Sequence, residues 1–275
     1  MGQARKNGEP VLSIVIPAYN EAKSVRQGAL QKVADFLSRQ AYAYELMVVD
    51  DGSEDETADL VHAFAKGHPS TRLIRGEHQG KARAVISGVR AASGRYVLFM
   101  DMDLSTSLTH VADAVEALAG GADIIIASRE APGAHRLGEP WVRRWLAKAF
   151  NYLVQLLLLP GISDTQCGFK AFRREVAQEL FPRLIVFSLS GDKVKGPRVT
   201  AFDVELLVMA RKRRYSIKQI PVTWRYVETR RVKPLVDSYR MFMEVMQVWL
   251  NNMRGKYDLD RGLASRRRTP GGGQS

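Results

Sequence analysis

Apolar runs and helical spacings alternate along the first half of the chain. Five apolar runs are typical of buried strands: VLSIVIPAYNE (11–21), YELMVVD (44–50), TRLIR (71–75), RYVLFMDMD (95–103) and DIIIASR (123–129). Between them, apolar residues recur every three or four positions, which predicts helices over 25–37, 56–65, 81–92 and 110–119. Strands and helices that alternate at short spacing indicate an α/β fold with a mostly parallel sheet flanked by helices.

The second half contains two long amphipathic patterns, over 140–160 and 234–256, separated by a predicted helix at 202–214 and a predicted strand at 217–224. Trp, Phe, Met and Leu line the apolar sides of the two patterns, and Arg and Lys flank them. Such helices are typical of a membrane interface. Core helices that cover the sheet, or helices that mediate homo-oligomerisation, are the alternatives. Because no stretch has the ~18 consecutive apolar residues of a spanning helix, we expect a protein that is soluble or lies on a membrane surface as a peripheral protein.

These patterns divide the chain into four expected regions. They are a flexible N-terminus (1–9), an α/β domain (10–228) that includes the pattern over 140–160, an amphipathic interface-helix region (229–260) and a disordered basic tail (261–275). The loop SLSGDKVKGPRVT (188–200) lies inside the domain and could become ordered when a ligand binds.

The net charge of the chain restricts the classes of molecule that it could bind. The 275 residues carry a net charge of +12, which suits nucleic acid, an anionic membrane face or a phosphorylated substrate. No aromatic-rich basic strand or recognition helix is evident, so a nucleic-acid-binding protein is disfavoured. The single cysteine, Cys167, excludes an internal disulfide and is interpreted as a small buried residue.

Polar and acidic residues follow three of the expected strands, at Asn20–Glu21, Asp50–Asp51 and Asp101–Asp103. In a parallel sheet these ends meet at one edge, where ligands bind. Asp101 and Asp103 are two residues apart and share one face of an extended chain. Hard oxygen ligands at that spacing suit Mg²⁺ or Mn²⁺ bound together with a diphosphate, although two solvated loop acids are the alternative. Asp50 and Asp51 either form a turn before the next helix or bind a base or ribose.

The order of the motifs along the chain resembles that of a known protein family. SIVIPAYNE, VVDDGSEDET, GKARAV, DMD, ASR, DTQCGFKAFRRE and FDVELL follow one another as in the family-two glycosyltransferases with the GT-A fold. Over about 11–257, and chiefly through DTQCGFKAF and AFDVELL, the chain is similar to the dolichyl-phosphate glucosyltransferase group of polyprenyl-phosphate sugar synthases.

The resemblance implies a role for each matching residue. The residues that would bind the nucleotide sugar are Pro17, Ala18, Tyr19, Glu21, Asp50, Asp51, Lys81, Asp101, Met102 and Asp103. Among these, Asp51 would face the uracil, and Asp101 and Asp103 would hold the metal. The residues that would act at the sugar or the acceptor are Asp103, Arg129, Gln166, Lys170 and Asp203. Ser105 stands where some relatives have a Gln that helps to hold the metal, and it is a weaker ligand.

The reaction that the resemblance implies is inverting transfer of glucose from UDP-glucose to a polyprenyl phosphate, with Mg²⁺ or Mn²⁺, by a peripheral protein on the cytoplasmic face of a membrane, which gives a β-linked product. GDP-mannose and a UDP-N-acetylhexosamine are alternative donors, and a non-lipid acceptor is an alternative acceptor. A phosphate acceptor has a second pKa near ~6, so it needs little help from a base. A hydroxyl acceptor would need a carboxylate, for which Asp164 or Asp203 would serve. Arg173 and Arg174 are further candidate cations for the phosphates, or an exposed pair at a helix start.

Overall fold

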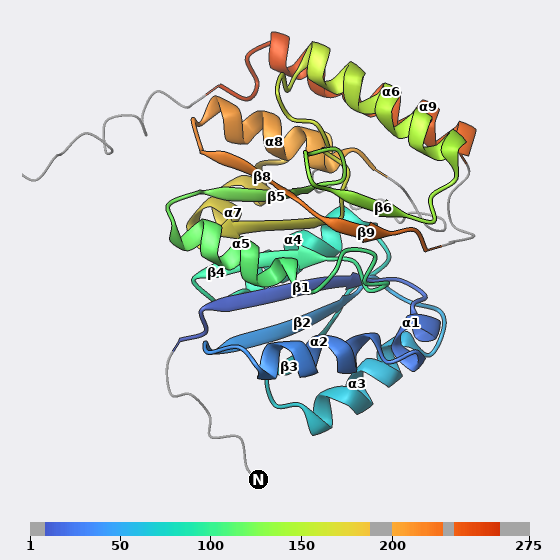
Figure 1. Cartoon of the computed structure of the whole chain (residues 1–275), viewed down its shortest axis with the longest axis vertical. Coiled ribbons are helices and arrows are strands. Elements are labelled where there is room, and N and C mark those ends of the chain that lie inside the picture. Colours follow the sequence, from blue (N-terminus) through green and yellow to red (C-terminus); the bar gives the residue numbers. More distant parts are fainter. Residues whose placement is uncertain (1–8, 188–199, 228–233, 259–275) are drawn as a thin grey trace, which may run out of the picture.

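A seven-stranded sheet forms the centre of the chain in our computed structural model, which describes residues 9–187, 200–227 and 234–258. Its strands lie in the order β3 (Thr71–Arg75), β2 (Tyr44–Asp50), β1 (Leu12–Ala18), β4 (Tyr96–Met100), β7 (Phe169–Arg173), β5 (Ile124–Ser128) and β8 (Ile217–Pro221). Only β7 pairs antiparallel with its neighbours. The sheet is therefore mostly parallel, as predicted (Figure 1).

Helices cover both faces of this sheet. The helices are α1 (Ala22–Arg26), α2 (Ala29–Ser38), α3 (Thr57–Gly67), α4 (Lys81–Ala91), α5 (His110–Ala119), α6 (Trp141–Leu157), α7 (Arg174–Leu180), α8 (Phe202–Lys212) and α9 (Pro234–Met253), with a 3-10 turn at Phe181–Arg183. Leu12, Ile14 and Ile16 of β1 pack in the core beneath α2, α3 and α5, whereas Val15 packs in the core with α4, α7 and α8. This alternation follows from the two-residue period of a strand.

Helix α4 packs unusually close to the sheet. A Cβ at Gly88 would lie 2.3 Å from Val15 Cγ1, so only a glycine fits at this point of contact. The expected single helix over 25–37 is wrong in detail. Gly28 adopts a φ of +79°, a left-handed conformation that glycine reaches at little cost, and it separates α1 from α2.

The expected strand over 217–224 is also divided. Its first part is β8 of the main sheet, and its last residues form β9 (Thr223–Arg225), which pairs with β6 (His135–Leu137) in a two-stranded sheet. An isolated bridge joins Trp224 to Thr106, shortly after the DMD motif. The small sheet therefore brings residues from the second half of the chain beside that motif.

Helices α6 and α9 lie together at one end of the molecule (Figure 1). Large apolar side chains on both helices remain exposed, among them Trp141, Trp145, Tyr152, Tyr239 and Met253. Within the described ranges, we find no helix that is both long enough and apolar enough to cross a bilayer. The predicted flexible N-terminus (except Glu9), most of the 188–200 loop and the predicted disordered tail lie outside the described residues.

Candidate functional site

The carboxyl ends of β2, β1 and β4 lie side by side at one edge of the sheet (Figure 1). These three strands run parallel to one another, so Asn20, Asp51 and Asp101, which follow them, emerge at the same edge. The sequence-based prediction that these strand ends converge is confirmed.

Asp101 pairs with a lysine from the neighbouring helix. Lys81, the first residue of α4, places its Nζ 2.5 Å from Asp101 Oδ1. Burial opposes the charge of Lys81, but the carboxylates of Asp101, Asp203 and Asp103 surround it and raise the pKa of its ammonium group. The sequence placed both residues near a nucleotide, but it did not indicate that they touch.

Ser105, which stands where some relatives have a metal-binding Gln, orients Asp103. The backbone N–H and the hydroxyl of Ser105 both donate hydrogen bonds to Asp103 Oδ1, at 2.9 and 2.5 Å. Burial and the nearby negative charge of Asp101 raise the pKa of the Asp103 carboxyl. Because the charge of Asp101 disfavours that of Asp103, a cation bound to both carboxylates would stabilise the pair. Ser105 in this structure positions Asp103.

A glycine leaves the space that Asp101 occupies. A Cβ at Gly168 would lie 1.9 Å from Asp101 Oδ2, which is far inside van der Waals contact. Gly168 immediately precedes β7, whose residue Phe169 pairs with Met100 of β4. The close approach of these two segments depends on the antiparallel insertion of β7, which sequence reasoning missed.

The carboxylate oxygens at this edge of the sheet suit a hard divalent cation that is also bound by a ligand. Asp101 and Asp103 supply carboxylate oxygens, the ligand type that Mg²⁺ and Mn²⁺ prefer. The described residues include no group of three or more His, Cys, Asp or Glu side chains placed to hold a metal ion. A cation held by two protein carboxylates needs further oxygen ligands, and a diphosphate provides them.

Asp51 organises the loop that leads to Lys81. Its buried carboxylate accepts hydrogen bonds from the backbone N–H groups of Gln79 and Gly80, both at 2.9 Å, and its Oδ2 lies 2.8 Å from His78 Nδ1. The ring of His78 stacks on Tyr19, with the ring centroids 3.9 Å apart. His78 was not singled out from the sequence, because nothing in its local pattern marks this contact.

Asp50 has a different environment. Its two carboxylate oxygens accept the Ser53 N–H at 3.3 and 3.4 Å, which matches the turn interpretation of this acid. The other residues that the sequence assigned to nucleotide binding have different positions and contacts. Pro17 and Ala18 belong to β1, Met102 packs its side chain in the core, and Glu21 accepts a hydrogen bond from the Ser24 hydroxyl at 2.6 Å.

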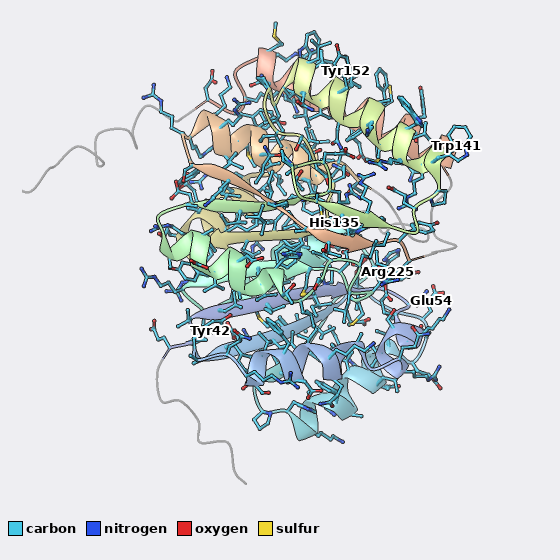
Figure 2. All side chains as sticks on the ribbon, viewed as in Figure 1. Tyr42, Glu54, His135, Trp141, Tyr152 and Arg225 are labelled. Carbon is cyan, nitrogen blue, oxygen red and sulfur yellow. The ribbon has the colours of Figure 1, made fainter. Side chains whose placement is uncertain are left out.

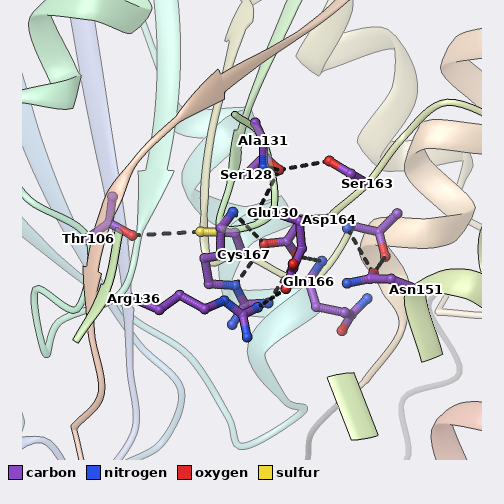
Figure 3. Close-up of polar contacts among 12 residues, drawn as sticks. Thr106, Ser128, Glu130, Ala131, Arg136, Asn151, Ser163, Asp164, Gln166 and Cys167 are labelled. Carbon is purple, nitrogen blue, oxygen red and sulfur yellow. Dashed lines mark hydrogen bonds and ion pairs between the residues drawn. The ribbon is translucent and has the colours of Figure 1, made fainter. Parts of the chain in front are cut away.

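Arg129 is held by Asp164 in a buried ion pair. Its Nε and Nη2 donate to the two oxygens of Asp164 at 2.7 and 2.9 Å, and its backbone N–H donates to Oδ2 at 2.9 Å. The side chains are 9% and 0% exposed. Although burial acts in the opposite direction, Arg129 holds the pKa of the Asp164 carboxyl well below its usual range. Gln166 lies beside this pair and donates its backbone N–H to Asp164 at 3.2 Å (Figure 3).

Lys170 forms the second buried pair. Its Nζ lies 2.7 Å from Asp203 Oδ1 and donates to the carbonyl oxygen of Cys167 at 2.6 Å, while its side chain is fully buried. Burial raises the pKa of the Asp203 carboxyl, and the charges of Lys170 and Lys81 oppose this rise. Cys167 is buried, as the sequence indicated.

The candidate cations Arg173 and Arg174 do not lie at this edge. Because β7 is antiparallel to β4, Arg173 pairs with Tyr96 at the start of β4, and its Nε donates to the Ala122 carbonyl. Arg174 donates to the carbonyl of Ser93. The expectation that they contact phosphates is wrong for this geometry. Arg225, which the sequence did not single out, is exposed on β9 and donates its backbone N–H to Ser105 at 2.8 Å.

Comparison with known protein families shows the class to which this chain belongs. Residues 13–181 match the model of glycosyl transferase family 2, and the chain therefore belongs to that family. Solved structures with the same fold include glucosyl-3-phosphoglycerate synthase from Mycobacterium tuberculosis in complex with Mn²⁺, UDP and glucosyl-3-phosphoglycerate. It is 21% identical with a TM-score of 0.59, over 92% of this chain and 82% of that chain.

Among curated proteins, the chain is similar to dolichyl-phosphate beta-glucosyltransferases. The dolichyl-phosphate beta-glucosyltransferase of Dictyostelium discoideum is 31% identical over 89% of this chain and 75% of its own length. The human dolichyl-phosphate beta-glucosyltransferase is 30% identical over 91% of this chain and 78% of its own length. The predicted family and the α/β GT-A fold are confirmed.

Proposed function

We propose that this chain transfers a hexose, glucose from UDP-glucose, to a dolichyl-type polyprenyl phosphate at a membrane surface and gives a β-linked product. The observation that carries the proposal is the group of Asp101, Asp103 and Lys81 at the carboxyl edge of the sheet, beside the Asp51 loop. The names of the curated relatives support the acceptor and the sugar, and the UDP and Mn²⁺ in a structural neighbour support the donor and the metal.

The departure of the nucleoside diphosphate from the sugar requires positive charge nearby. In a single displacement, an acceptor oxygen forms a bond to the anomeric carbon while the bond to the diphosphate breaks and its electron pair leaves with the nucleoside diphosphate. Asp101 and Asp103 would hold Mg²⁺ or Mn²⁺, which when bound stabilises this negative charge as a Lewis acid. Lys81 adds a fixed positive charge at the start of α4. A displacement in one step inverts an α-linked donor to a β-linked product.

The buried ion pairs favour a phosphate acceptor over a hydroxyl. Arg129 holds both oxygens of Asp164 and lowers its pKa, so Asp164 is a poor base. Asp203 Oδ1 lies 2.7 Å from the ammonium group of Lys170, so a proton taken up by this carboxylate would weaken the ion pair. A phosphate acceptor is already ionised near neutral pH and requires no such base.

Exposed aromatic side chains support a membrane surface. Trp141 and Trp145 on α6 are 73% and 67% exposed, and Arg143, Arg144 and Lys148 lie on the same helix. Figure 2 places Trp141 on the same side of the molecule as Glu54, which follows β2 at the site edge. An apolar helix surface with basic neighbours suits the interface of an anionic bilayer. The lipid acceptor would thus approach the protein from the side on which this edge of the sheet lies.

A transfer assay tests the proposed function. Purified protein is incubated with labelled UDP-glucose, short polyprenyl phosphate and Mn²⁺, and lipid-extractable label is counted. We expect a metal-dependent product that is lost in Asp103→Ala and kept in Asp35→Ala, a control at an exposed acid on α2. GDP-mannose and UDP-N-acetylglucosamine in parallel determine donor choice. Absence of lipid product with all three donors, or full activity of Asp103→Ala, contradicts the proposal.

A further inference from the structure

We propose that Lys81 is an internal counter-ion of the metal site, which occupies Asp101 before the metal arrives and moves to the diphosphate when the metal binds. The inference rests on the proposed function, because it requires a metal and a diphosphate at Asp101. Its consequence is that metal and nucleotide each strengthen the binding of the other through this one lysine.

The geometry of the pair creates a competition. Lys81 Nζ lies 2.5 Å from Asp101 Oδ1, and the other oxygen, Oδ2, fills the space where a Cβ at Gly168 would lie. Mg²⁺ needs carboxylate oxygens at about 2.0–2.1 Å in a near-octahedral arrangement. A divalent ion on Oδ1 would compete with the ammonium group for this oxygen, and the two positive charges would repel each other. Metal binding at Oδ1 therefore disfavours the contact between Lys81 and Asp101.

The lysine is able to leave. Its side chain is 34% exposed and that of Asp101 is 38% exposed, so each is partly buried but can still be reached by a ligand. Lys170 provides the contrast, because it is fully buried and tied to both Asp203 and the carbonyl of Cys167. The flexible four-carbon stem of lysine lets its charge move while the backbone stays in place.

The displaced ammonium group needs a new anion. The backbone of Lys81 is fixed at the first residue of α4, and the preceding Gly80 is held by the Asp51 carboxylate. From this position the side chain remains at the edge where the strands end, and the diphosphate of the donor supplies the negative charge that replaces Asp101. Metal binding without nucleotide leaves the ammonium group without this partner, so the metal alone should bind weakly.

Binding of Mn²⁺ alone, measured by electron paramagnetic resonance of the free ion, tests the inference without any turnover. We expect Lys81→Met to bind Mn²⁺ about tenfold more tightly than the wild type when nucleotide is absent, within the roughly 5–150-fold range typical of coupled sites. UDP should increase the Mn²⁺ affinity of this variant by a smaller factor than in the wild type. Lys32→Met, at an exposed position on α2, should match the wild type.

Lys81→Gln is measured alongside, so that a folding failure of one variant leaves the other to decide. If neither folded variant binds Mn²⁺ more tightly than the wild type, the counter-ion role is refuted, even when the wild type binds UDP and Mn²⁺ together. If the wild type binds no UDP with Mn²⁺ present, the proposed function itself fails. The two failures are therefore distinguishable.

Discussion

Removal of the Arg129 side chain separates an anchoring role from a direct role at the phosphates. The Arg129→Met variant leaves Asp164 ionised and fully buried, with the two oxygens no longer neutralised. Loss of one partner from a buried ion pair costs about 3–5 kcal/mol of folding free energy. At about 2–4 °C per kcal/mol for a chain of this size, the melting temperature should fall by roughly 6–20 °C. An arginine that served only as a phosphate ligand would show almost no such loss.

Urea unfolding followed by circular dichroism measures this cost. Arg129→Met combined with Asp164→Asn removes the stranded charge, so the double variant should be more stable than Arg129→Met alone. Arg75→Met is the matched control, because Arg75 forms an exposed pair with Asp59 and such pairs contribute about 0–1 kcal/mol. A free energy of unfolding for Arg129→Met within about 1 kcal/mol of the wild type would refute the reasoning.

The pH dependence of the same pair has a defined sign. The folded protein lowers the pKa of Asp164, so its ion pair stabilises the fold above the unfolded pKa of about 3.9. This contribution is lost as the pH falls from about 5 through the lowered pKa, because the unfolded chain then binds more protons. The stability difference between the wild type and Arg129→Met should therefore be largest near neutral pH and shrink in acid.

Three further changes test separate parts of the site. Gly168→Ala forces a Cβ against Asp101 Oδ2, so it should weaken UDP–Mn²⁺ binding by about tenfold or more, as measured by calorimetry; unchanged affinity contradicts the steric argument. Trp141→Glu with Trp145→Glu should abolish flotation with anionic liposomes while the melting temperature stays near that of the wild type, because both side chains are exposed. Arg225 is exposed on β9 and is hydrogen-bonded through its backbone to Ser105, so its charge lies close to the Asp103 segment; Arg225→Ala should therefore raise the KM for the lipid phosphate and leave UDP affinity unchanged, and an altered UDP affinity with an unchanged KM would contradict this reasoning.

Local patterns predicted a large part of the fold. The strand and helix periods, read over 5–11 residues at a time, matched β1 to β5 and α3 to α5 in order. The acids after β1, β2 and β4 could be assigned to one edge, because parallel strands must end at the same side of a sheet. The break at Gly28 was missed, since a single glycine leaves the apolar period on both sides unchanged.

The partners of the site residues could not be predicted in this way. Lys81 and Asp101 are 20 residues apart, and Arg129 and Asp164 are 35 apart, so no local window contains either pair. A charged residue in a sequence looks the same whether it is to bind a phosphate or a neighbouring acid. Arg129 and Lys170 therefore looked like free cations, although each forms a buried ion pair.

The sequence by itself determined the family, the alternation of strands and helices, and the row of acids at the strand ends, because these features depend on residue type and spacing within one element. Only the tertiary structure decided which charges meet. The antiparallel insertion of β7 between β4 and β5 turns Arg173 away from the site, and it places Lys170 beside Asp203 and Gly168 beside Asp101. Strand direction and order are set by packing across the whole sheet, and the short segment FKAFR encodes neither.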